Sequence, residues 1–436
     1  MSGSKKVAFH TLGCKLNFSE TSTLAREFEL GGYERAERGD VVDIHVINSC
    51  SVTDTADKKC RYLIRKIAKN SPNSIIAVTG CYAQLKSEEV AAIDGVDLVI
   101  GNNKKDEIVK LCMNLTTKGK SSIFSCETER LTSFFSAFSS GDRTRTFLKV
   151  QDGCNYNCTY CTIPLARGKS RNISIEELVA QANEIASKGI KEIVLTGVNI
   201  GDFGRTTSES FLSLVEALDR VEGIERYRIS SIEPNLLTSE IIDFCATSAK
   251  FQPHFHIPLQ SGSDKILKLM HRRYNTSKFR EKIEKVKQKI PNVFLGIDVI
   301  VGFPGETDDD FAECYNLLSE LEPAYLHVFP YSERANTPAI LMEGKVSTQQ
   351  KEQRVKKLSE LSAKLHSRFI QSQVGRRAKV LIESSQKGGL MYGHTENYIK
   401  TELPYNRELI GQIVDVQLES SDKGDVAKGE LIKNIS

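Results

Sequence analysis

The sequence predicts an α/β protein in three parts: an N-terminal parallel α/β sheet domain, a central partial (β/α)6 barrel and a small all-β barrel. Two stretches alternate short β-branched segments with helical segments, which is typical of parallel sheets with crossover helices. The C-terminal stretch contains only short strand-like segments separated by turns. We expect domains over 1–130, 147–347 and 373–436, a linker over 131–146 and a connecting helix over 348–372.

The amino-acid composition is typical of a soluble protein and favours one that uses metal or redox chemistry. The 436 residues are 40% hydrophobic and 26% charged, with a net charge of +3, as in an ordinary soluble protein. No run of apolar residues is long enough to predict a membrane span, and the start shows no secretory signal. Eleven cysteines in such a chain favour metal or redox chemistry over a disulfide framework.

Each strand expected in the N-terminal part is followed by a cysteine. The pairs are 7–11 with Cys14, 42–47 with Cys50, and 75–79 with Cys81. Ligands of open α/β sheets bind beyond the carboxyl ends of the strands, so the three cysteines can meet at one place. A metal cluster and three small buried turn residues both fit this pattern. Cys60 is a rival ligand, but the helical pattern over 55–69 favours packing.

Six further strand and helix units follow. The strands are expected over 147–150, 192–196, 226–230, 254–257, 294–301 and 324–329. This repeat predicts a partial barrel whose chemistry lies at the C-terminal strand ends. Polar segments fall at those ends, over 196–199, 230–234, 260–262 and 302–306. Ser174 and Glu177 form a capping box that begins the first long helix.

Cys154, Cys158 and Cys161 form a C-x3-C-x2-C loop after the first strand of this barrel. Soft sulfur ligands select iron–sulfur clusters, zinc or copper(I). Structural zinc normally has four protein ligands, but the next cysteine and histidine are Cys245 and His254. Three thiolates on a four-iron cluster leave one iron open to a ligand that is not protein. We predict such a cluster, with zinc or unrelated buried thiols as the alternatives.

Basic residues gather in two places. Residues 345–379 contain ten Lys or Arg but only two acidic residues. In the second place, Lys58, Arg61, Arg65 and Lys69 lie on one face of a predicted helix. Strands are expected beyond them over 378–382, 392–395, 398–401 and 410–418. Basic stretches beside a small β-barrel favour nucleic-acid binding, and solvated helix faces are the alternative.

With these motifs assembled, the sequence resembles the radical S-adenosylmethionine methylthiotransferases over essentially its full length. The order matches: a three-cysteine domain, a radical barrel, then a TRAM domain, which is a small RNA-binding β-barrel. Residues 153–168, with their Pro-x-x-Arg-Gly end, are similar to the barrel signature of this family. The combination is more specific than the C-x3-C-x2-C core alone.

The family has three branches, which act on isopentenyladenosine in tRNA, threonylcarbamoyladenosine in tRNA, or an aspartate of a ribosomal protein. Segments 12–17 with Glu20, 52–59 and 79–84 are similar to the threonylcarbamoyl branch, and Cys60 departs from it, where serine is expected. The resemblance implies 2-methylthiolation of threonylcarbamoyladenosine at tRNA position 37. The other two branches, and a non-catalytic zinc-containing RNA-binding protein, are the alternatives.

The resemblance also implies the cofactors. One 4Fe-4S cluster on Cys154, Cys158 and Cys161 would cleave S-adenosylmethionine to a 5′-deoxyadenosyl radical. An auxiliary 4Fe-4S cluster would deliver the sulfur, and its expected ligands are Cys14, Cys50 and Cys81. The residues expected to contact S-adenosylmethionine are Gly197, Asn199, Glu233, Gly302 and Gly305.

Partners follow from the same resemblance. Lys15 is expected to meet the threonyl carboxylate, and Arg167 and Gln260 to make polar contacts in the cavity. Arg376, Arg377 and Lys379 are expected to hold RNA phosphates. The implied partners are the tRNA anticodon loop and an external electron donor such as a flavodoxin or ferredoxin. The chain is expected to be a cytoplasmic monomer that does not contact a membrane.

Overall fold

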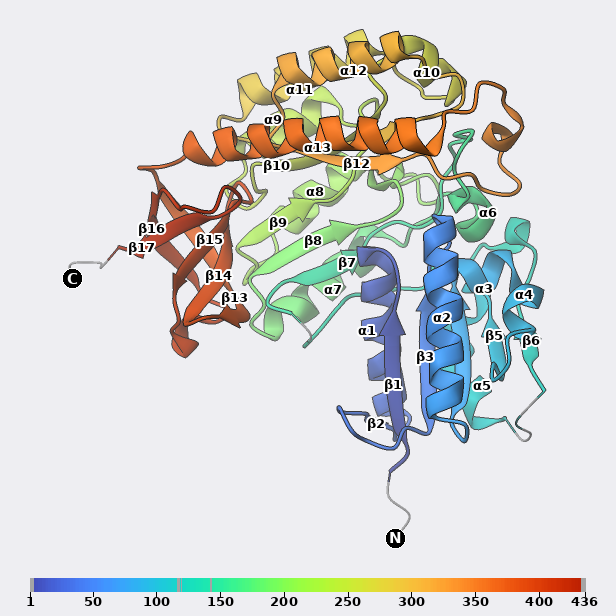
Figure 1. Cartoon of the computed structure of the whole chain (residues 1–436). Coiled ribbons are helices and arrows are strands. Elements are labelled where there is room, and N and C mark those ends of the chain that lie inside the picture. Colours follow the sequence, from blue (N-terminus) through green and yellow to red (C-terminus); the bar gives the residue numbers. More distant parts are fainter. Residues whose placement is uncertain (1–3, 116–117, 119, 142, 433–436) are drawn as a thin grey trace.

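Three parts follow one another along the chain in Figure 1: a blue N-terminal sheet, a central green-to-orange layer of strands and helices, and a red barrel. The computed structural model describes residues 4–115, 118, 120–141 and 143–432. The outermost ends of the predicted first and last domains, and residue 142 of the predicted linker, lie outside these residues.

The N-terminal part is a parallel sheet in the order β2-β1-β3-β4-β5-β6. Its strands are β1 (Lys6–Thr11), β2 (Glu34–Arg35), β3 (Ile44–Ser49), β4 (Ile75–Gly80), β5 (Leu98–Ile100) and β6 (Ser122–Phe124). Its helices are α1 (Lys15–Leu30), α2 (Asp54–Asn70), α3 (Cys81–Leu85), α4 (Ser87–Ala91) and α5 (Ile108–Met113). The predicted strands β1, β3 and β4 are confirmed, whereas the short strands β2, β5 and β6 were not predicted.

The central part contains all six predicted strands. They are β7 (Thr146–Lys149), β8 (Glu192–Thr196), β9 (Arg226–Ile229), β10 (His254–Gln260), β11 (Phe294–Val301) and β12 (Tyr325–Pro330). Two parallel sheets, β7-β8-β9 and β10-β11-β12, meet through a bridge between Ser231 and His256. The partial barrel is thus one wall whose inner face carries side chains from every strand.

Helices cover the outer face of this wall. They are α7 (Ile175–Ser187), α8 (Phe211–Asp219), α9 (Ser239–Thr247), α10 (Asp264–Leu269), α11 (Thr276–Lys289) and α12 (Asp308–Leu321), whereas the short α6 (Ile163–Arg167) lies against α3 of the N-terminal part. The predicted capping box is present: Ser174 accepts from the Glu177 N–H, and the Glu177 side chain accepts from the Ser174 N–H. One large core of leucine, isoleucine, valine and phenylalanine side chains joins these helices to the strands.

A long helix, α13 (Thr348–Gln371), leads to a closed barrel in the order β13-β14-β15-β17-β16. The strands are β13 (Arg377–Lys387), β14 (Leu390–Thr395), β15 (Lys400–Pro404), β16 (Ile413–Glu419) and β17 (Ala427–Leu431). The last strand was not predicted, because its sequence alternates weakly. Over the described residues, no helix is both long and apolar enough to cross a membrane.

Two buried arginines of β9 fasten this barrel to the central part. Arg228 donates from Nη2 to the Thr395 carbonyl and from Nη1 to the Glu396 carbonyl, both at 2.7 Å. Arg226 donates from Nη2 to the Lys379 carbonyl at 2.7 Å. Because the guanidinium groups are buried, losing these carbonyl partners would leave charged donors unpaired. The barrel is therefore an integral part of the molecule.

The predicted linker is irregular, as expected, but its middle is not a surface loop. Ala137 and Phe138 are buried, and the Phe138 carbonyl accepts hydrogen bonds from the side chains of Thr23 and Arg26 on α1. The segment thus packs the N-terminal part against the central part, where α1 contacts β7.

Candidate active site

The C-x3-C-x2-C loop lies between β7 and α6, with a hydrogen-bond donor at each sulfur. The donors are the Tyr156 N–H to Cys154 Sγ (3.4 Å), Arg272 Nη1 to Cys158 Sγ (3.1 Å) and the Ile163 N–H to Cys161 Sγ (3.4 Å). Donors to sulfur favour the thiolate form and tune the reduction potential of an iron–sulfur cluster. The loop is therefore built to hold three thiolates.

Burial raises the pKa of the Cys154 thiol to about 11. Burial, and next the neighbouring Cys158, raise the pKa of Cys161 to about 12. Both residues are thus protonated at neutral pH without a metal, and a metal that binds them must release their protons.

The three N-terminal cysteines gather as predicted, because each follows the carboxyl end of a parallel strand. Cys14 is the N-cap of α1, Cys50 follows β3 and Cys81 opens α3. Gly13 has φ +101°, and a Cβ there would lie 2.8 Å from Cys50 Sγ, so only glycine lets the two loops approach this closely. Burial, and next the nearby Cys81, raise the pKa of Cys50 to about 11.

Neither cysteine set is arranged in this structure as three ligands of one zinc ion. Thiolates on a tetrahedral zinc with bonds of about 2.3 Å lie roughly 3.8 Å apart. Over the described residues, neither set has all three sulfur atoms within 4.8 Å of one another. Cys60, the rival ligand, is instead packed with Ile64 and Tyr82 in an apolar core.

A buried ion-pair network joins the two cysteine sets. Arg167 Nη1 lies 3.0 Å from both Glu20 Oε1 on α1 and Asp152 Oδ1 after β7. Lys149 pairs with the same two carboxylates, at 2.9 Å and 2.8 Å. Burial alone would raise the pKa of Glu20, but Arg167, Lys105 and Lys149 together hold it well below its ordinary value. The structure thus places Arg167 in a network between domains, not in a substrate cavity.

A cavity of about 310 Å³ opens beside Cys14, between α1, the inner face of the central strands and the C-terminal barrel. Its lining includes four cationic side chains, from Lys15, Arg143, Arg145 and Arg228. Arg145 pairs with Glu383, and Arg228 pairs with a buried glutamate. Lys15 has no ion-pair partner within the described residues, and desolvation lowers its pKa. The cavity therefore carries an uncompensated positive charge.

The C-terminal barrel supplies Tyr398 to this cavity. Its backbone has φ +64°, which is uncommon for a bulky residue and signals a functional or structural constraint. The guanidinium groups of Arg145 and Arg228 lie 5.3 and 5.0 Å from its ring centroid. The barrel thus forms a wall of the cavity as well as an outer surface.

A second cavity, of about 270 Å³, opens beside Cys161. It is lined by Thr53 from the N-terminal part and by Gln260 and Asp298 from the central strands. Gln260 has φ +68°, and its side-chain oxygen is buried without a hydrogen-bond partner within the described residues. Such an orphaned acceptor favours a ligand in this cavity, which agrees with the predicted polar role of Gln260.

Three predicted cofactor contacts, Glu233, Asn199 and Gly197, lie close to the C-x3-C-x2-C loop. Glu233 pairs with Arg272, the arginine that donates to Cys158. Asn199 is buried, and neither its amide nitrogen nor its oxygen has a partner within the described residues. At Gly197, a Cβ would lie 2.8 Å from a neighbouring isoleucine, so glycine keeps this turn tight. Asn199 in particular is free to bind a polar cofactor group.

The other two predicted cofactor contacts are engaged within the protein. The Gly302 N–H donates to Glu306 Oε2 at 2.6 Å, and the Gly305 N–H donates to the Gly344 carbonyl at 2.8 Å. Arg354 of α13 completes this turn by pairing with Glu306 at 2.5 Å. The turn therefore anchors α13, and both N–H groups already have acceptors.

Arg376, Arg377 and Lys379 are exposed at the start of the C-terminal barrel. Arg376 donates to Gln373 at 2.6 Å, and Lys379 pairs with Asp415 at 3.3 Å. Arg376 and Arg377 also line a groove of about 300 Å³ against the central part. These cations lie on the surface, as expected for residues that meet phosphates.

Several residues of the site were not predicted, although two pairs of them carry a local signal. His254 and His256 alternate on β10, as Arg226 and Arg228 do on β9, and alternate residues of a strand face the same side. Polar residues at alternate positions of an otherwise apolar strand thus indicate an inward polar face. Arg272 and Tyr398 lie outside any such pattern.

Three segments of the chain match known families. Residues 6–101 match the uncharacterized protein family UPF0004, residues 148–318 the radical SAM superfamily, and residues 371–432 the TRAM domain. A solved radical S-adenosylmethionine methyltransferase, TsrM from Kitasatospora setae, has a TM-score of 0.57 at 12% identity. The match covers 78% of this chain and 77% of that one, and it shows a shared fold.

Curated relatives span nearly the whole chain. The threonylcarbamoyladenosine tRNA methylthiotransferase MtaB of Bacillus subtilis is 41% identical, over 94% of this chain and 93% of that protein. Its Aquifex aeolicus counterpart is 37% identical, over 94% and 99%. A tRNA-2-methylthio-N(6)-dimethylallyladenosine synthase of Clostridium tetani is 33% identical, over 94% and 92%. The chain therefore belongs to the radical S-adenosylmethionine tRNA methylthiotransferases, as a member of the MtaB type.

Proposed function

We propose that this protein converts threonylcarbamoyladenosine at position 37 of tRNA to its 2-methylthio derivative. The observation that carries the proposal is the position of the two cysteine sets. Cys14 and Cys161 each border a cavity, and the inner face of the central strands lines both cavities. A single nucleotide held there lies within reach of two metal centres, as sulfur insertion at an unactivated carbon requires.

Each set of three cysteines would hold one of the two clusters. Cys154, Cys158 and Cys161 would hold the cluster that binds S-adenosylmethionine, and Cys14, Cys50 and Cys81 the auxiliary cluster. When bound, these groups supply the one-electron chemistry and the sulfur. The buried network around Arg167 fixes the distance between the two sets, and Arg272 places a positive charge beside Cys158. Asn199 and Gln260, with free buried polar atoms, orient the cofactor and the nucleotide.

Lys15 supports the choice of substrate within the family. Its ammonium group lies in the cavity beside Cys14, with Arg145 and Arg228 nearby and no ion-pair partner of its own within the described residues. Threonylcarbamoyladenosine carries a carboxylate, and dimethylallyladenosine carries none. A site built around a charge partner rejects a substrate that lacks it, because the substrate then covers the cation and leaves it unpaired.

Two RNAs test this function. Anaerobically reconstituted enzyme is incubated with S-adenosylmethionine, a reductant and tRNA bearing either threonylcarbamoyladenosine or isopentenyladenosine, and the nucleosides are identified by mass spectrometry. We expect the 2-methylthio product only from the first RNA. Equal turnover of both RNAs would refute the substrate choice, and turnover of a ribosomal protein alone would refute the RNA substrate.

The partners of this reaction are also proposals. The anticodon loop presents an unpaired base that is free to leave its stack and enter the cavity. The exposed Arg376, Arg377 and Lys379 would hold phosphates outside this loop. An external one-electron donor, such as a flavodoxin or ferredoxin, would reduce the clusters of a monomeric enzyme in the cytoplasm, where tRNA is modified.

A further inference from the structure

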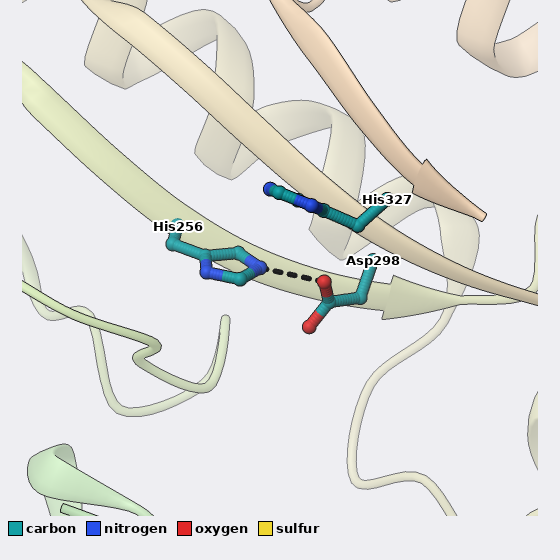
Figure 2. Close-up of side chains that lie close together, drawn as sticks. All are labelled: His256, Asp298 and His327. Atoms are coloured by element: carbon teal, nitrogen blue, oxygen red, sulfur yellow. Dashed lines mark hydrogen bonds and ion pairs between the residues drawn. The ribbon is translucent and has the colours of Figure 1, made fainter. Parts of the chain in front are cut away.

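Three polar side chains converge on the inner face of the central sheet, and one of them, Asp298, lines the cavity that opens beside Cys161. His256 lies on β10, Asp298 on β11 and His327 on β12, which are neighbouring parallel strands. Asp298 is directly opposite His327 in the register, and His256 Nε2 lies 2.6 Å from Asp298 Oδ1. Figure 2 shows the three side chains pointing toward one another. One ligand atom of each lies within 4.8 Å of the other two.

His327 has no structural partner that accounts for its position. Its ring lies 4.7 Å from that of His256 and 4.8 Å from that of Tyr325, but it forms no hydrogen bond or ion pair within the described residues. The three side chains are partly exposed, so an ion can reach them.

We propose that His256, Asp298 and His327 form a binding site for one divalent transition-metal ion. Two imidazoles and one carboxylate suit zinc, iron(II) or cobalt(II), whereas magnesium and calcium prefer an all-oxygen shell. Ligand atoms bound at about 2.0–2.2 Å lie within roughly 4.4 Å of one another, so small side-chain rotations close the site. Three protein ligands leave coordination positions open toward the cavity that Asp298 lines.

The surroundings of the site set its affinity. Asp298 is the carboxylate of the site, and the charge of Lys15 acts on both Asp298 and His327. Because like charges repel, Lys15 weakens the binding of a cation here. Removing that charge should therefore strengthen metal binding, while removing a ligand should weaken it.

Zinc titration of the full-length protein tests the site without RNA. Both clusters are first reconstituted under anaerobic conditions, so that the cluster cysteines are occupied, and zinc and iron are then measured by mass spectrometry. We expect one equivalent of zinc in the unaltered protein. His327→Ala and Asp298→Asn should weaken zinc binding by at least about tenfold, since even outer-sphere changes cost about 10–100-fold. Lys15→Met should strengthen it, and all variants should keep their iron.

His10→Ala is the matched control, because His10 belongs to another close histidine pair, with His45 at 3.0 Å, on the N-terminal sheet. This variant should bind zinc as the unaltered protein does. Zinc-edge X-ray absorption should show nitrogen and oxygen ligands at about 2.0–2.1 Å. Sulfur ligands at about 2.3 Å, equal zinc binding by His327→Ala, or no zinc in the unaltered protein would each overturn the site.

Discussion

The two cysteine sets reach the same kind of site by different routes. The barrel set occupies a single loop of eight residues, whereas the N-terminal set is spread over 67 positions and meets only because three strands run parallel. The first set is local and depends on hydrogen bonds within its own loop and from Arg272. The second depends on the register of the sheet and on a glycine that allows close approach. A local site survives distortion of the fold better than a dispersed one.

Removing the ligands gives the largest effect. Replacing Cys154, Cys158 and Cys161 with alanine should abolish reductive cleavage of S-adenosylmethionine while about half the iron remains, as expected for one of two equal clusters. Replacing Cys14, Cys50 and Cys81 should leave cleavage intact and stop methylthiolation. Iron analysis and detection of 5′-deoxyadenosine separate the two outcomes. Full iron content in the second variant would show that another set of residues, with Cys60 the first to test, holds the auxiliary cluster.

The second largest effect is expected from the ion-pair network around Arg167, whose loss should affect the N-terminal cysteine set more than the barrel set. Glu20→Gln keeps the shape of the side chain but leaves buried cations unpaired, which should cost about 3–5 kcal/mol of unfolding free energy. Since the pKa of Glu20 is depressed, its contribution is present above the ordinary carboxyl range and lost only as pH falls through the lowered value. The auxiliary cluster should be lost first on mild heating. Denaturant titration and iron loss measure this, with the exposed Glu29→Gln on α1 as the control.

The choice between the two tRNA substrates should depend on residues beside the N-terminal cysteine set, above all on Lys15. Lys15→Met should lower kcat/KM for threonylcarbamoyladenosine tRNA by about 30-fold or more, as loss of one partner of a buried charge pair costs about 2–5 kcal/mol. Cleavage of S-adenosylmethionine without RNA should not change. Kinetics with both RNAs check this, and Arg273→Met, a cation near the other set, serves as the comparison. An unchanged kcat/KM for Lys15→Met would remove the lysine from substrate recognition.

Replacing surface cations of the C-terminal barrel should have the smallest effect and should leave both cysteine sets intact. Arg376→Glu with Arg377→Glu should weaken tRNA binding by about tenfold and lower the slope of log affinity against log salt by somewhat less than one unit per lost contact. Both clusters should remain. Filter binding at two salt concentrations measures this, and an unchanged slope would mean that these charges form only a solvated face.

The sequence predicted most of the architecture, because parallel strands carry a strong β-branched pattern, and the six cysteines follow the ends of such strands; their role as cluster ligands stays a prediction. It missed β2, β5, β6 and β17, which are short strands with little pattern of their own. The sequence analysis placed Arg167 in a cavity, because nothing in the sequence shows that its guanidinium group pairs with Glu20, which is 147 positions away. Long-range ion pairs between domains leave no periodic signal.

Because the C-terminal barrel is fixed to the central part, it determines which nucleotide of a bound RNA can reach the cavity. Arg226 and Arg228 hold the backbone of the barrel, and Tyr398 reaches from it into the cavity beside Cys14. The surface that we propose to hold phosphates is thus at a fixed distance from the cavity beside Cys14. An RNA bound on that surface presents to the cavity only the nucleotide at one set distance along its backbone. The protein then selects a position by length, as a ruler does, without reading the neighbouring bases.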